Sequence, residues 1–235
     1  MRGRLYLVPS LLGAGAPADV LPVRTIAIAR GLAHFVVENA KPARQFLKAL
    51  GPERPLQEIA IEELGEAPSV ERCAALLAPA RAGHDLGLVS DAGCPGVADP
   101  GALLVAAAHR EGIAVVPLVG PSSIVLALMG SGMNGQGFAF HGYLPIKAEA
   151  RGEAIRRLEA ESRRSGYAQL FIETPYRNAA LLEALVANCQ PLTRLAVAAD
   201  LTTAGETIES RPIAEWRGRD FSRYAKRPAL FVLQA

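Results

Sequence analysis

Short apolar runs alternate with amphipathic runs through the first half of the chain. Apolar runs that end at Gly, Pro or polar residues are typical of buried strands, and longer runs with one polar face are typical of helices. The pattern predicts strands at Leu5–Val8, His34–Glu38, Leu56–Leu64, Asp85–Val89 and Ile113–Leu118. It predicts helices at Val23–Arg30, Pro42–Leu50, Ser69–Arg81 and Ala102–Glu111. Such alternation indicates a parallel sheet with helices on both faces.

The second half of the chain has a different pattern. Its predicted strands are Phe138–Tyr143, Gln169–Glu173, Arg194–Ala199 and Ala229–Leu233, and its predicted helices are Pro121–Met129, Ile146–Arg164 and Tyr176–Ala187. Gly, Pro or basic residues are frequent in Pro9–Pro22 and Trp216–Arg227, which we interpret as loops. We therefore expect an α/β chain with two αβα domains, residues 1–119 and 120–235, with a mainly parallel N-terminal sheet and a mixed C-terminal sheet.

Composition fits this fold and leaves the partner open. Half of the 235 residues are hydrophobic, which suffices for a substantial core. Lys and Arg number 25 against 23 Asp and Glu, so the formal net charge is +2. That balance neither requires nor excludes nucleic acid, and any RNA-binding surface must be a local patch.

The cysteines and histidines indicate neither a metal site nor a disulfide framework. Cys73, Cys94 and Cys189 are far apart and form no CxxC pair, and the four histidines lack metal-ligand spacing. Such cysteines fit a reducing compartment. No signal peptide and no uninterrupted apolar stretch of transmembrane length is apparent. We expect a cytoplasmic protein with no metal and no membrane partner.

Three loops follow predicted strands and are candidates for ligand binding, because open α/β sheets bind ligands at the carboxyl ends of their strands. The first, Val8–Gly15, contains Gly13 and Gly15, which permit close backbone approach. It does not match the dinucleotide-binding fingerprint. A flexible surface loop explains it equally well.

The second loop, Ser90–Gly101, is the most informative stretch of the chain. Its shape is restricted by Gly93, Pro95, Gly96 and Pro100. A loop of this kind can present backbone N–H and C=O groups to a polar ligand. Asp91 and Asp99 could orient the loop or meet a cation, and the alternative is that they only cap turns. Because so many Gly and Pro residues seldom serve packing alone, a binding role is favoured.

The third loop, Val119–Ser123, follows a buried strand and opens a helix. Serine hydroxyls and free N–H groups at a helix N-terminus suit a carboxylate. An ordinary N-cap at Ser122 explains the same residues. Composition alone favours that simpler interpretation.

Several motifs occur in order along the chain. They are Val89–Pro95 with Asp99–Gly101, Val116–Ser123, Phe140–Lys147, Phe171–Arg177, and Ala198–Thr203 with Gly205–Glu206. This series resembles the class III, or tetrapyrrole methylase-like, methyltransferases. Within that group the chain is most similar to the bacterial enzymes that methylate a cytidine ribose 2′-oxygen of small-subunit ribosomal RNA.

The resemblance implies two α/β domains with a cofactor cleft between them and S-adenosyl-L-methionine as the methyl donor. It also implies ribosomal RNA or the small ribosomal subunit as a partner, and a homodimer. By matching motifs, it implies cofactor contacts, many of them through backbone atoms, from Pro9, Gly93, Cys94, Pro95, Val97, Ser122, Ser123, Ile172, Glu173, Ala196, Pro228 and Ala229.

Four features depart from the family pattern. The first loop reads Val8–Gly13 where the family usually has Thr-Pro-Ile-Gly-Asn-Leu, and Glu38–Lys41 replaces Glu-Asp-Thr-Arg. Asp200 stands where the family usually has Glu, and we expect no counterpart of the small basic C-terminal extension of the RNA enzymes. These changes bear on the substrate more than on cofactor binding.

Methyl transfer requires mainly that the acceptor be aligned with the methyl carbon and that water be excluded. An oxygen acceptor also benefits from a base or a neighbouring cation. Our candidate catalytic residues are Glu173, Arg177 and Glu38. Glu173 and Arg177 are preferred because they flank a Pro where a strand meets a helix. For each residue, an ion-paired or solvated role is the alternative.

The helix expected at Ile146–Arg164 does not itself indicate RNA binding. Its arginines alternate with glutamates, which favours a solvated helix with pairs at i,i+4 spacing. The RNA partner is therefore implied by the resemblance and not by charge. Two other functions stay open: methylation of a tetrapyrrole or another small molecule, and a non-catalytic module that binds S-adenosylmethionine.

Overall fold

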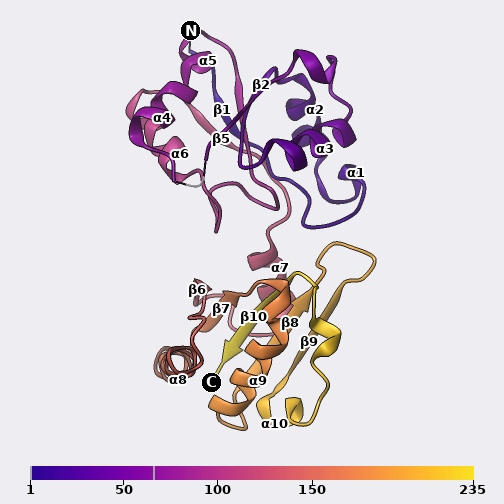
Figure 1. Ribbon diagram of the computed structural model, residues 1–235, viewed down its shortest axis with the longest axis vertical. Helices are drawn as coiled ribbons and strands as arrows, with labels where there is room; N and C mark the ends of the chain where they lie inside the picture. The colour runs from indigo at the N-terminus through magenta and orange to yellow at the C-terminus, as the bar shows by residue number, and fades with distance from the viewer. Residues whose placement is uncertain (1, 66) are drawn as a thin grey trace. The chain divides into compact units, whose positions relative to one another are not determined.

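The structure is a computed structural model that describes residues 2–65 and 67–235. The chain divides into two compact units, of which the first ends at Ser122 and the second begins at Ser123. Each unit contains one five-stranded sheet (Figure 1).

The first unit is built on a parallel sheet with the strand order β3-β2-β4-β1-β5. Its strands are β1 (Leu5–Leu7), β2 (His34–Val37), β3 (Ala60–Glu63), β4 (Leu86–Val89) and β5 (Val115–Pro117). Its helices are α1 (Pro17–Val20), α2 (Val23–Gly31), α3 (Ala40–Leu50), the 3-10 turn η1 (Leu56–Glu58), α4 (Val70–Leu76), α5 (Ala78–Arg81) and α6 (Ala102–Arg110). Because all five strands run the same way, their carboxyl ends meet at one edge.

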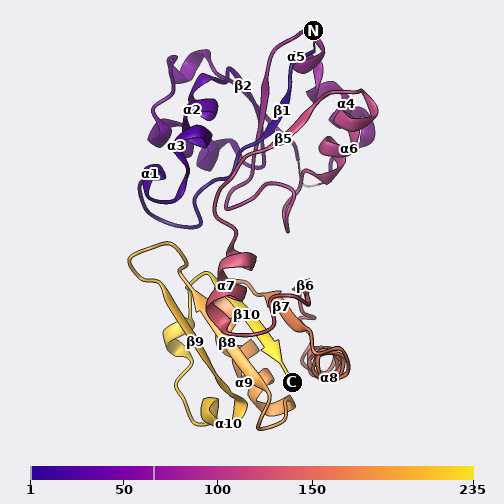
Figure 2. The same ribbon diagram turned by 180° about the vertical axis from the view of Figure 1, so that it is seen from behind.

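Helices cover both faces of this sheet. Successive residues of a strand point to opposite faces. Leu5 accordingly packs in the cluster that includes α4 and α6, whereas Tyr6 packs in the cluster that includes α2 and α3. Figures 1 and 2 show the two helix pairs on opposite sides of the strands. Burial from both sides explains why β4 is apolar along its whole length.

The predicted helix Ser69–Arg81 is present as two helices. Ser69 is the N-cap, as predicted, and its Oγ accepts the Arg72 N–H at 3.1 Å. The helix then breaks at Leu77, where α4 ends and α5 begins. Pro79 explains the break, because a proline inside a helix removes a hydrogen bond and clashes with the preceding turn.

Two further predictions in the first unit need correction. The expected strand Leu56–Leu64 begins with η1 and becomes β3 only at Ala60. The expected loop Pro9–Pro22 contains the single-turn helix α1, which starts at Pro17. Proline is favoured at the first position of a helix, where its missing N–H costs nothing.

The second unit is built on a mixed sheet with the strand order β6-β7-β10-β8-β9. Its strands are β6 (Phe138–Tyr143), β7 (Ala168–Ile172), β8 (Arg194–Ala199), β9 (Thr207–Pro212) and β10 (Ala229–Gln234). Its helices are α7 (Ser123–Ser131), α8 (Ala148–Ser165), α9 (Asn178–Asn188), α10 (Ile213–Trp216) and the 3-10 turns η2 (Pro175–Arg177) and η3 (Ser222–Tyr224). Only the β6–β7 pair is parallel among these strands. A parallel sheet and a mixed sheet confirm the predicted α/β fold class.

The main core of this unit lies between the sheet and helices α8 and α9. Phe171 and Phe231 stack there with ring centroids 5.9 Å apart. Trp216 and Tyr224 are also fully buried in this core, although they lie in the segment that we expected to be a loop. The Trp216 indole N–H donates to the Leu195 carbonyl at 3.1 Å. Helix α7 packs on the opposite face of the sheet (Figure 2).

Strand β9 was not predicted from the sequence. Among the described strands it pairs only with β8, at the edge of the sheet, and most of its residues are partly exposed. Edge strands carry charged side chains that blunt their exposed edge, so their sequences lack a continuous apolar signal.

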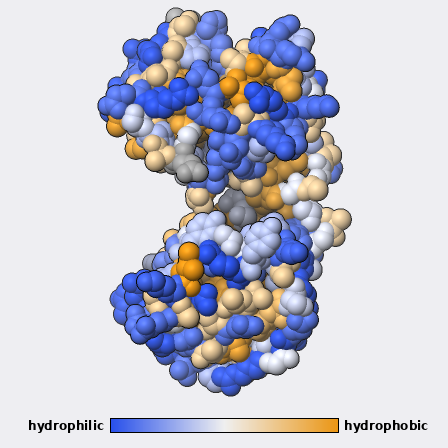
Figure 3. All heavy atoms as spheres, in the orientation of Figure 1, coloured by the Kyte–Doolittle hydropathy of each residue, from blue (hydrophilic) through white to orange (hydrophobic). Residues whose placement is uncertain are grey.

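Hydrophilic residues cover most of the visible surface of each unit (Figure 3). Within the described part of the chain, every helix is too short or too polar to cross a membrane.

Gly120 provides a test of the packing in the first unit. A Cβ built on Gly120 would lie 2.4 Å from Pro9 Cβ, whereas one on Gly15 would meet nothing within 4 Å. We expect Gly120→Ala to lower the free energy of unfolding by about 1–3 kcal/mol through overpacking. Gly15→Ala is the control and should change it little. Urea unfolding followed by circular dichroism measures the free energy of unfolding of both variants. An equal loss in Gly120→Ala and Gly15→Ala would contradict the close contact between Gly120 and Pro9.

Candidate functional site

The three predicted loops of the first unit leave neighbouring strands at one edge of the sheet. β1 lies between β4 and β5, with Leu5 opposite Leu86 and Val115. The loops after these strands are therefore side by side, although they are distant in sequence. The Ser10 N–H donates to the Gly93 carbonyl at 2.9 Å, which joins the first loop to the second.

The third loop contacts both of the others. Gly120 packs against Pro9, and the Cys94 thiol lies 3.5 Å from the Pro121 carbonyl oxygen. Burial, followed by the charge of Asp99, raises the pKa of the Cys94 thiol. Cys94 is consequently a protonated contact within the loops and not a reactive thiolate.

Loop Ser90–Gly101 follows a path that depends on left-handed backbone conformations. Gly93, Gly96 and Gly101 have φ values of 75°, 80° and 142°. Ala98 has a φ of 64°, which is uncommon for a residue with a Cβ. At Gly93 a Cβ would also lie 3.1 Å from the Leu12 side chain. Such strain concentrates at functional sites, where the surroundings hold it in place.

Acidic side chains gather beside this loop. The Asp91 N–H donates to Glu38 Oε2 at 3.1 Å, and Asn39 Nδ2 donates to Asp91 Oδ2 at 2.7 Å. Burial and the charge of Glu38 raise the pKa of Asp99 to about 6, although a hydrogen bond from Ser90 acts in the opposite direction. Glu38 was a predicted catalytic residue. The grouping of Asp99 with Glu38 was not predicted, because the two are far apart in the sequence.

Glu173 and Arg177, the two preferred catalytic candidates, form an ion pair in the second unit. β7 ends just before Glu173, and the 3-10 turn η2 brings Arg177 back over it. Glu173 Oε1 accepts from Arg177 Nη2 at 2.6 Å and from the Thr174 N–H at 2.7 Å. The Glu173 side chain is 0% exposed and that of Arg177 is 32% exposed. Glu173 Oε2 is buried without a hydrogen-bond partner among the described residues.

Four further predicted cofactor residues of the second unit lie on or next to its three central strands. Ile172 lies opposite Leu230, next to Pro228 and Ala229. These residues are close to the end of β7 that carries Glu173. Ala196 lies further along β8, opposite Val232, and is fully buried.

The predicted residues of the loops differ in exposure and belong to both units. Val97 is exposed, whereas Gly93 and Pro95 are buried. Ser122 is the last residue of the first unit, and Ser123 begins α7 in the second. In the described ranges no group of three or more His, Cys, Asp or Glu residues is placed to hold a metal ion.

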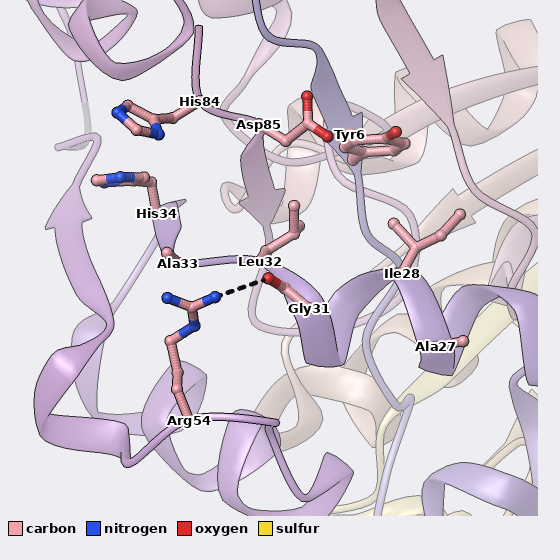
Figure 4. Close-up of a pocket in the computed structure, with 10 residues that line it drawn as sticks. All are labelled: Tyr6, Ala27, Ile28, Gly31, Leu32, Ala33, His34, Arg54, His84 and Asp85. Carbon is pink, nitrogen blue, oxygen red and sulfur yellow. Dashed lines mark hydrogen bonds between the residues drawn. The ribbon is translucent and has the colours of Figure 1, made fainter. Parts of the chain in front are cut away.

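A cavity of about 400 Å³ lies elsewhere in the first unit (Figure 4). It is lined by residues from the amino ends of β2 and β4, including His34, His84 and Asp85, together with Arg54. The two histidine rings lie 5.3 Å apart, and Arg54 donates to the Gly31 carbonyl at 3.3 Å. None of the predicted site residues lines this cavity, which is at the opposite edge of the sheet from the three loops.

Comparison with known proteins identifies relatives along nearly the whole chain. Residues 4–216 match the family described as Tetrapyrrole (Corrin/Porphyrin) Methylases. A protein of Escherichia coli O157:H7 named Ribosomal RNA small subunit methyltransferase I is 32% identical over 234 residues, which cover 98% of this chain and 78% of the relative. A protein of the same name from Xylella fastidiosa is 34% identical over 231 residues, covering 98% and 80%.

Solved structures show the same fold. The methyltransferase CobJ superposes with a TM-score of 0.65 at 18% identity, covering 99% of this chain and 94% of that one. The uroporphyrin-III-C-methyltransferase from Thermus thermophilus superposes with a TM-score of 0.58 at 22% identity, covering 100% and 93%.

The relatives and the fold agree with the motifs found in the sequence and confirm the predicted family. The proteins of Escherichia coli and Xylella fastidiosa are matched over most of their own length, and the matches cover 98% of this chain. The likeness therefore includes both sheets and all three loops. The chain belongs to the tetrapyrrole (corrin/porphyrin) methylase family and is an S-adenosylmethionine-dependent methyltransferase.

Proposed function

We propose that the methyl acceptor is a ribose 2′-hydroxyl of ribosomal RNA in the small ribosomal subunit. The observation that carries this proposal is the identity of 32% and 34%, over 98% of the chain, with two proteins named Ribosomal RNA small subunit methyltransferase I. The resemblance of the motifs to the enzymes that modify a cytidine ribose supports the same acceptor.

Two buried polar atoms of the described residues fit the methyl donor and its acceptor. Ser10 Oγ in the first unit and Glu173 Oε2 in the second are buried polar atoms for which the described residues offer no hydrogen-bond partner. Buried polar atoms normally have a partner. A polar group of S-adenosylmethionine can supply one to Ser10 Oγ, and the hydroxyl of the methyl acceptor can supply one to Glu173 Oε2. When bound, S-adenosylmethionine supplies an electrophilic methyl group on a positively charged sulfur.

We assign contacts with the methyl donor to backbone and side-chain atoms of the predicted set. In the first unit these are Pro9, Gly93, Cys94, Pro95, Val97 and Ser122. In the second unit they are Ser123, Ile172, Glu173, Ala196, Pro228 and Ala229. Gly93 is suited to this role because its left-handed conformation and lack of a Cβ let a ligand approach the backbone closely.

Glu173 and Arg177 are the proposed catalytic pair. Arg177 holds Glu173 Oε1 and so fixes the orientation of the carboxylate. Glu173 Oε2 then remains available to accept the proton of a hydroxyl, which is the task of a general base. Glu38 has a different proposed role: because it accepts the Asp91 N–H, it positions the loop that contacts the methyl donor.

We also propose that the protein works in the cytoplasm as a homodimer. The three cysteines are free, which fits a reducing compartment. Exposed apolar side chains in the second unit support an interface, and they include Met129 on α7, Phe138 and Tyr143 on β6, and Ile146 beyond it. Exposed apolar side chains that gather on one surface commonly mark protein contacts, and three of these four lie within residues 138–146.

Cofactor binding can be tested with a matched pair of glycine variants. Gly93 and Gly51 have similar left-handed φ values of 75° and 67°, but Gly51 ends α3 and has open space around it. Both alanine variants should lose about 1 kcal/mol of stability from backbone strain. We expect Gly93→Ala to weaken S-adenosylmethionine binding at least 10-fold by calorimetry and Gly51→Ala to leave it unchanged. Equal affinity of both variants for S-adenosylmethionine would refute the proposed contact between Gly93 and the methyl donor.

The acceptor can be tested by transfer of tritiated methyl groups to purified small ribosomal subunits from a strain that lacks this protein. We expect incorporation at a ribose 2′-oxygen. Glu173→Gln should reduce the rate by about 10²-fold or more, as for loss of a general base. Glu183→Gln is the control, since Glu183 is exposed on α9.

The outcomes of that assay separate the alternatives. No incorporation by the wild-type protein would rule out the ribosomal acceptor. Transfer to a porphyrin instead of RNA would assign the protein to the tetrapyrrole enzymes. Cofactor binding without transfer to either would indicate a non-catalytic module.

The raised pKa of Asp99 predicts a pH dependence of stability. The folded state holds the Asp99 proton up to about pH 6, whereas an unfolded Asp releases it near pH 4. The contribution of Asp99 to stability is therefore present below pH 4 and is lost as the pH rises to 6. We expect Asp99→Asn to be more stable than the wild type at pH 8, by on the order of 1 kcal/mol after allowance for solvent screening. Urea unfolding at pH 5 and pH 8 measures this, and the free energies of unfolding of Asp99→Asn and the wild type should differ less at pH 5 than at pH 8.

A further inference from the structure

Strand β9 and the segment that follows it gather arginines around one carboxylate. Glu209 and Arg211 are two residues apart on β9 and so share a face of the strand. Arg219 and Arg223 reach the same carboxylate from the segment after α10. These four residues, Glu209, Arg211, Arg219 and Arg223, are called the arginine cluster below.

Each guanidinium in the arginine cluster contacts Glu209. Arg223 Nη2 hydrogen-bonds Glu209 Oε1, and the nearest nitrogens of Arg211 and Arg219 lie 3.6 Å and 3.7 Å from Oε2. The hydrogen bond from Arg223 and the charges of all three arginines lower the pKa of Glu209. Glu209 is thus ionised. Arg211 also pairs with Glu215 at 3.5 Å, so three guanidiniums face two carboxylates and keep a net charge of +1.

The carboxylate lies deeper than the cations. The side chain of Glu209 is 24% exposed, against 37% for Arg211 and Arg219 and 45% for Arg223. An anion that approaches from solvent therefore meets guanidinium groups before it meets Glu209. Glu209 holds the arginines in place without blocking them.

Two buried aromatic rings help to orient the arginines. The Arg219 guanidinium carbon lies 5.9 Å from the centre of the Trp216 ring, and that of Arg223 lies 4.8 Å from the centre of the Tyr224 ring. Arg219 Nε also donates to the Glu215 carbonyl at 2.8 Å. Arginines that are already ordered lose less side-chain entropy when they bind a ligand.

The positive charge extends beyond the cluster along the same segment. Residues 209–227 contain six basic residues, Arg211, Arg217, Arg219, Arg223, Lys226 and Arg227, against three acidic ones, Glu209, Glu215 and Asp220. Helix α8 differs, because residues 149–164 contain five arginines against four glutamates. Arg227 pairs with Asp200, outside this range, at 2.6 Å, so the first segment keeps an excess of two positive charges and is a local positive patch in a chain whose formal net charge is +2.

This positive segment is attached to the turn that carries the proposed catalytic pair. The Lys226 N–H donates to the Pro175 carbonyl at 2.9 Å. Asn178 Nδ2 donates to the carbonyls of Tyr224 and Arg227 at 3.1 Å and 2.7 Å. The basic segment and the Glu173–Arg177 turn are thus joined within one unit, so a ligand at that turn can extend over the arginines.

We propose that the arginine cluster binds the phosphate backbone of the RNA substrate on the flank of the catalytic turn. The inference rests on the proposed function, since it takes RNA to be the acceptor. Planar guanidinium groups bind phosphate oxygens in pairs. A polynucleotide offers a row of phosphates that matches several separate cations along one segment, whereas a single free phosphate would engage only one or two of them. Such contacts set the position of the strand and carry no base specificity.

The test compares two double variants that each remove two exposed arginines. Arg219→Gln/Arg223→Gln changes the cluster, and Arg163→Gln/Arg164→Gln changes the end of α8, where both arginines are exposed and paired with glutamates. Fluorescence anisotropy with a labelled RNA fragment of the small subunit measures the Kd at salt concentrations from about 50 to 200 mM. Calorimetry with S-adenosylmethionine checks that each variant keeps its fold and its cofactor site.

We expect the cluster variant to bind RNA about 10-fold more weakly and to lower the slope of log K against log salt by about 1 to 2, as for the loss of one or two phosphate contacts. The α8 variant should match the wild type. Unchanged RNA binding in the cluster variant would overturn the proposal, and so would an equal loss in both variants. If the cluster variant does not fold, Arg223→Lys, which keeps the charge but not the planar fork, should still weaken RNA binding.

Failure of the proposed function gives a different result. In that case the wild type binds RNA through the cluster but transfers no methyl group to small subunits. Cluster-dependent binding to anionic phospholipid vesicles with no binding to RNA would overturn the RNA proposal and indicate a membrane contact instead.

Discussion

The parallel pairing of β1 with both β4 and β5 is the constraint on which the candidate site depends. Because these strands run in one direction, three loops that are far apart in sequence leave the sheet at the same edge. The hydrogen bond from Ser10 to Gly93 then becomes possible. A shift of one residue in any pairing would turn every side chain of that strand to the other face. The register of the buried strands therefore also determines the arrangement of the loops.

Much of this arrangement could be predicted, because continuous apolar runs and strand-exit loops are local features of the sequence. Glu173 and Arg177 could be singled out for the same reason, because they flank a Pro at the end of a strand, but their ion pair becomes visible only in the structure. Features that depend on distant residues could not be found in this way. The pKa of Asp99 depends on Glu38. β9 becomes recognisable as a strand only through its pairing with β8, and the burial of Trp216 depends on a core assembled from the whole second unit.

One departure from the family pattern has a structural explanation. Asn39 stands where the family usually carries an acid, and its amide donates a hydrogen bond to Asp91. Glu38, Asp91 and Asp99 already concentrate negative charge beside the loop, and burial makes that charge costly at Asp99. An amide at position 39 compensates part of this charge, where a further carboxylate would add to the repulsion.

Trp216 is the single tryptophan of the chain, and its fully buried ring lies in the core of the second unit. Indole emission from this protein therefore originates in one half of the molecule. A sample whose first unit had lost its structure would keep a native emission spectrum as long as the second unit stayed folded. Emission would instead respond to changes around Arg219, which lies over the indole ring. The protein thus carries an intrinsic optical reporter of its basic surface.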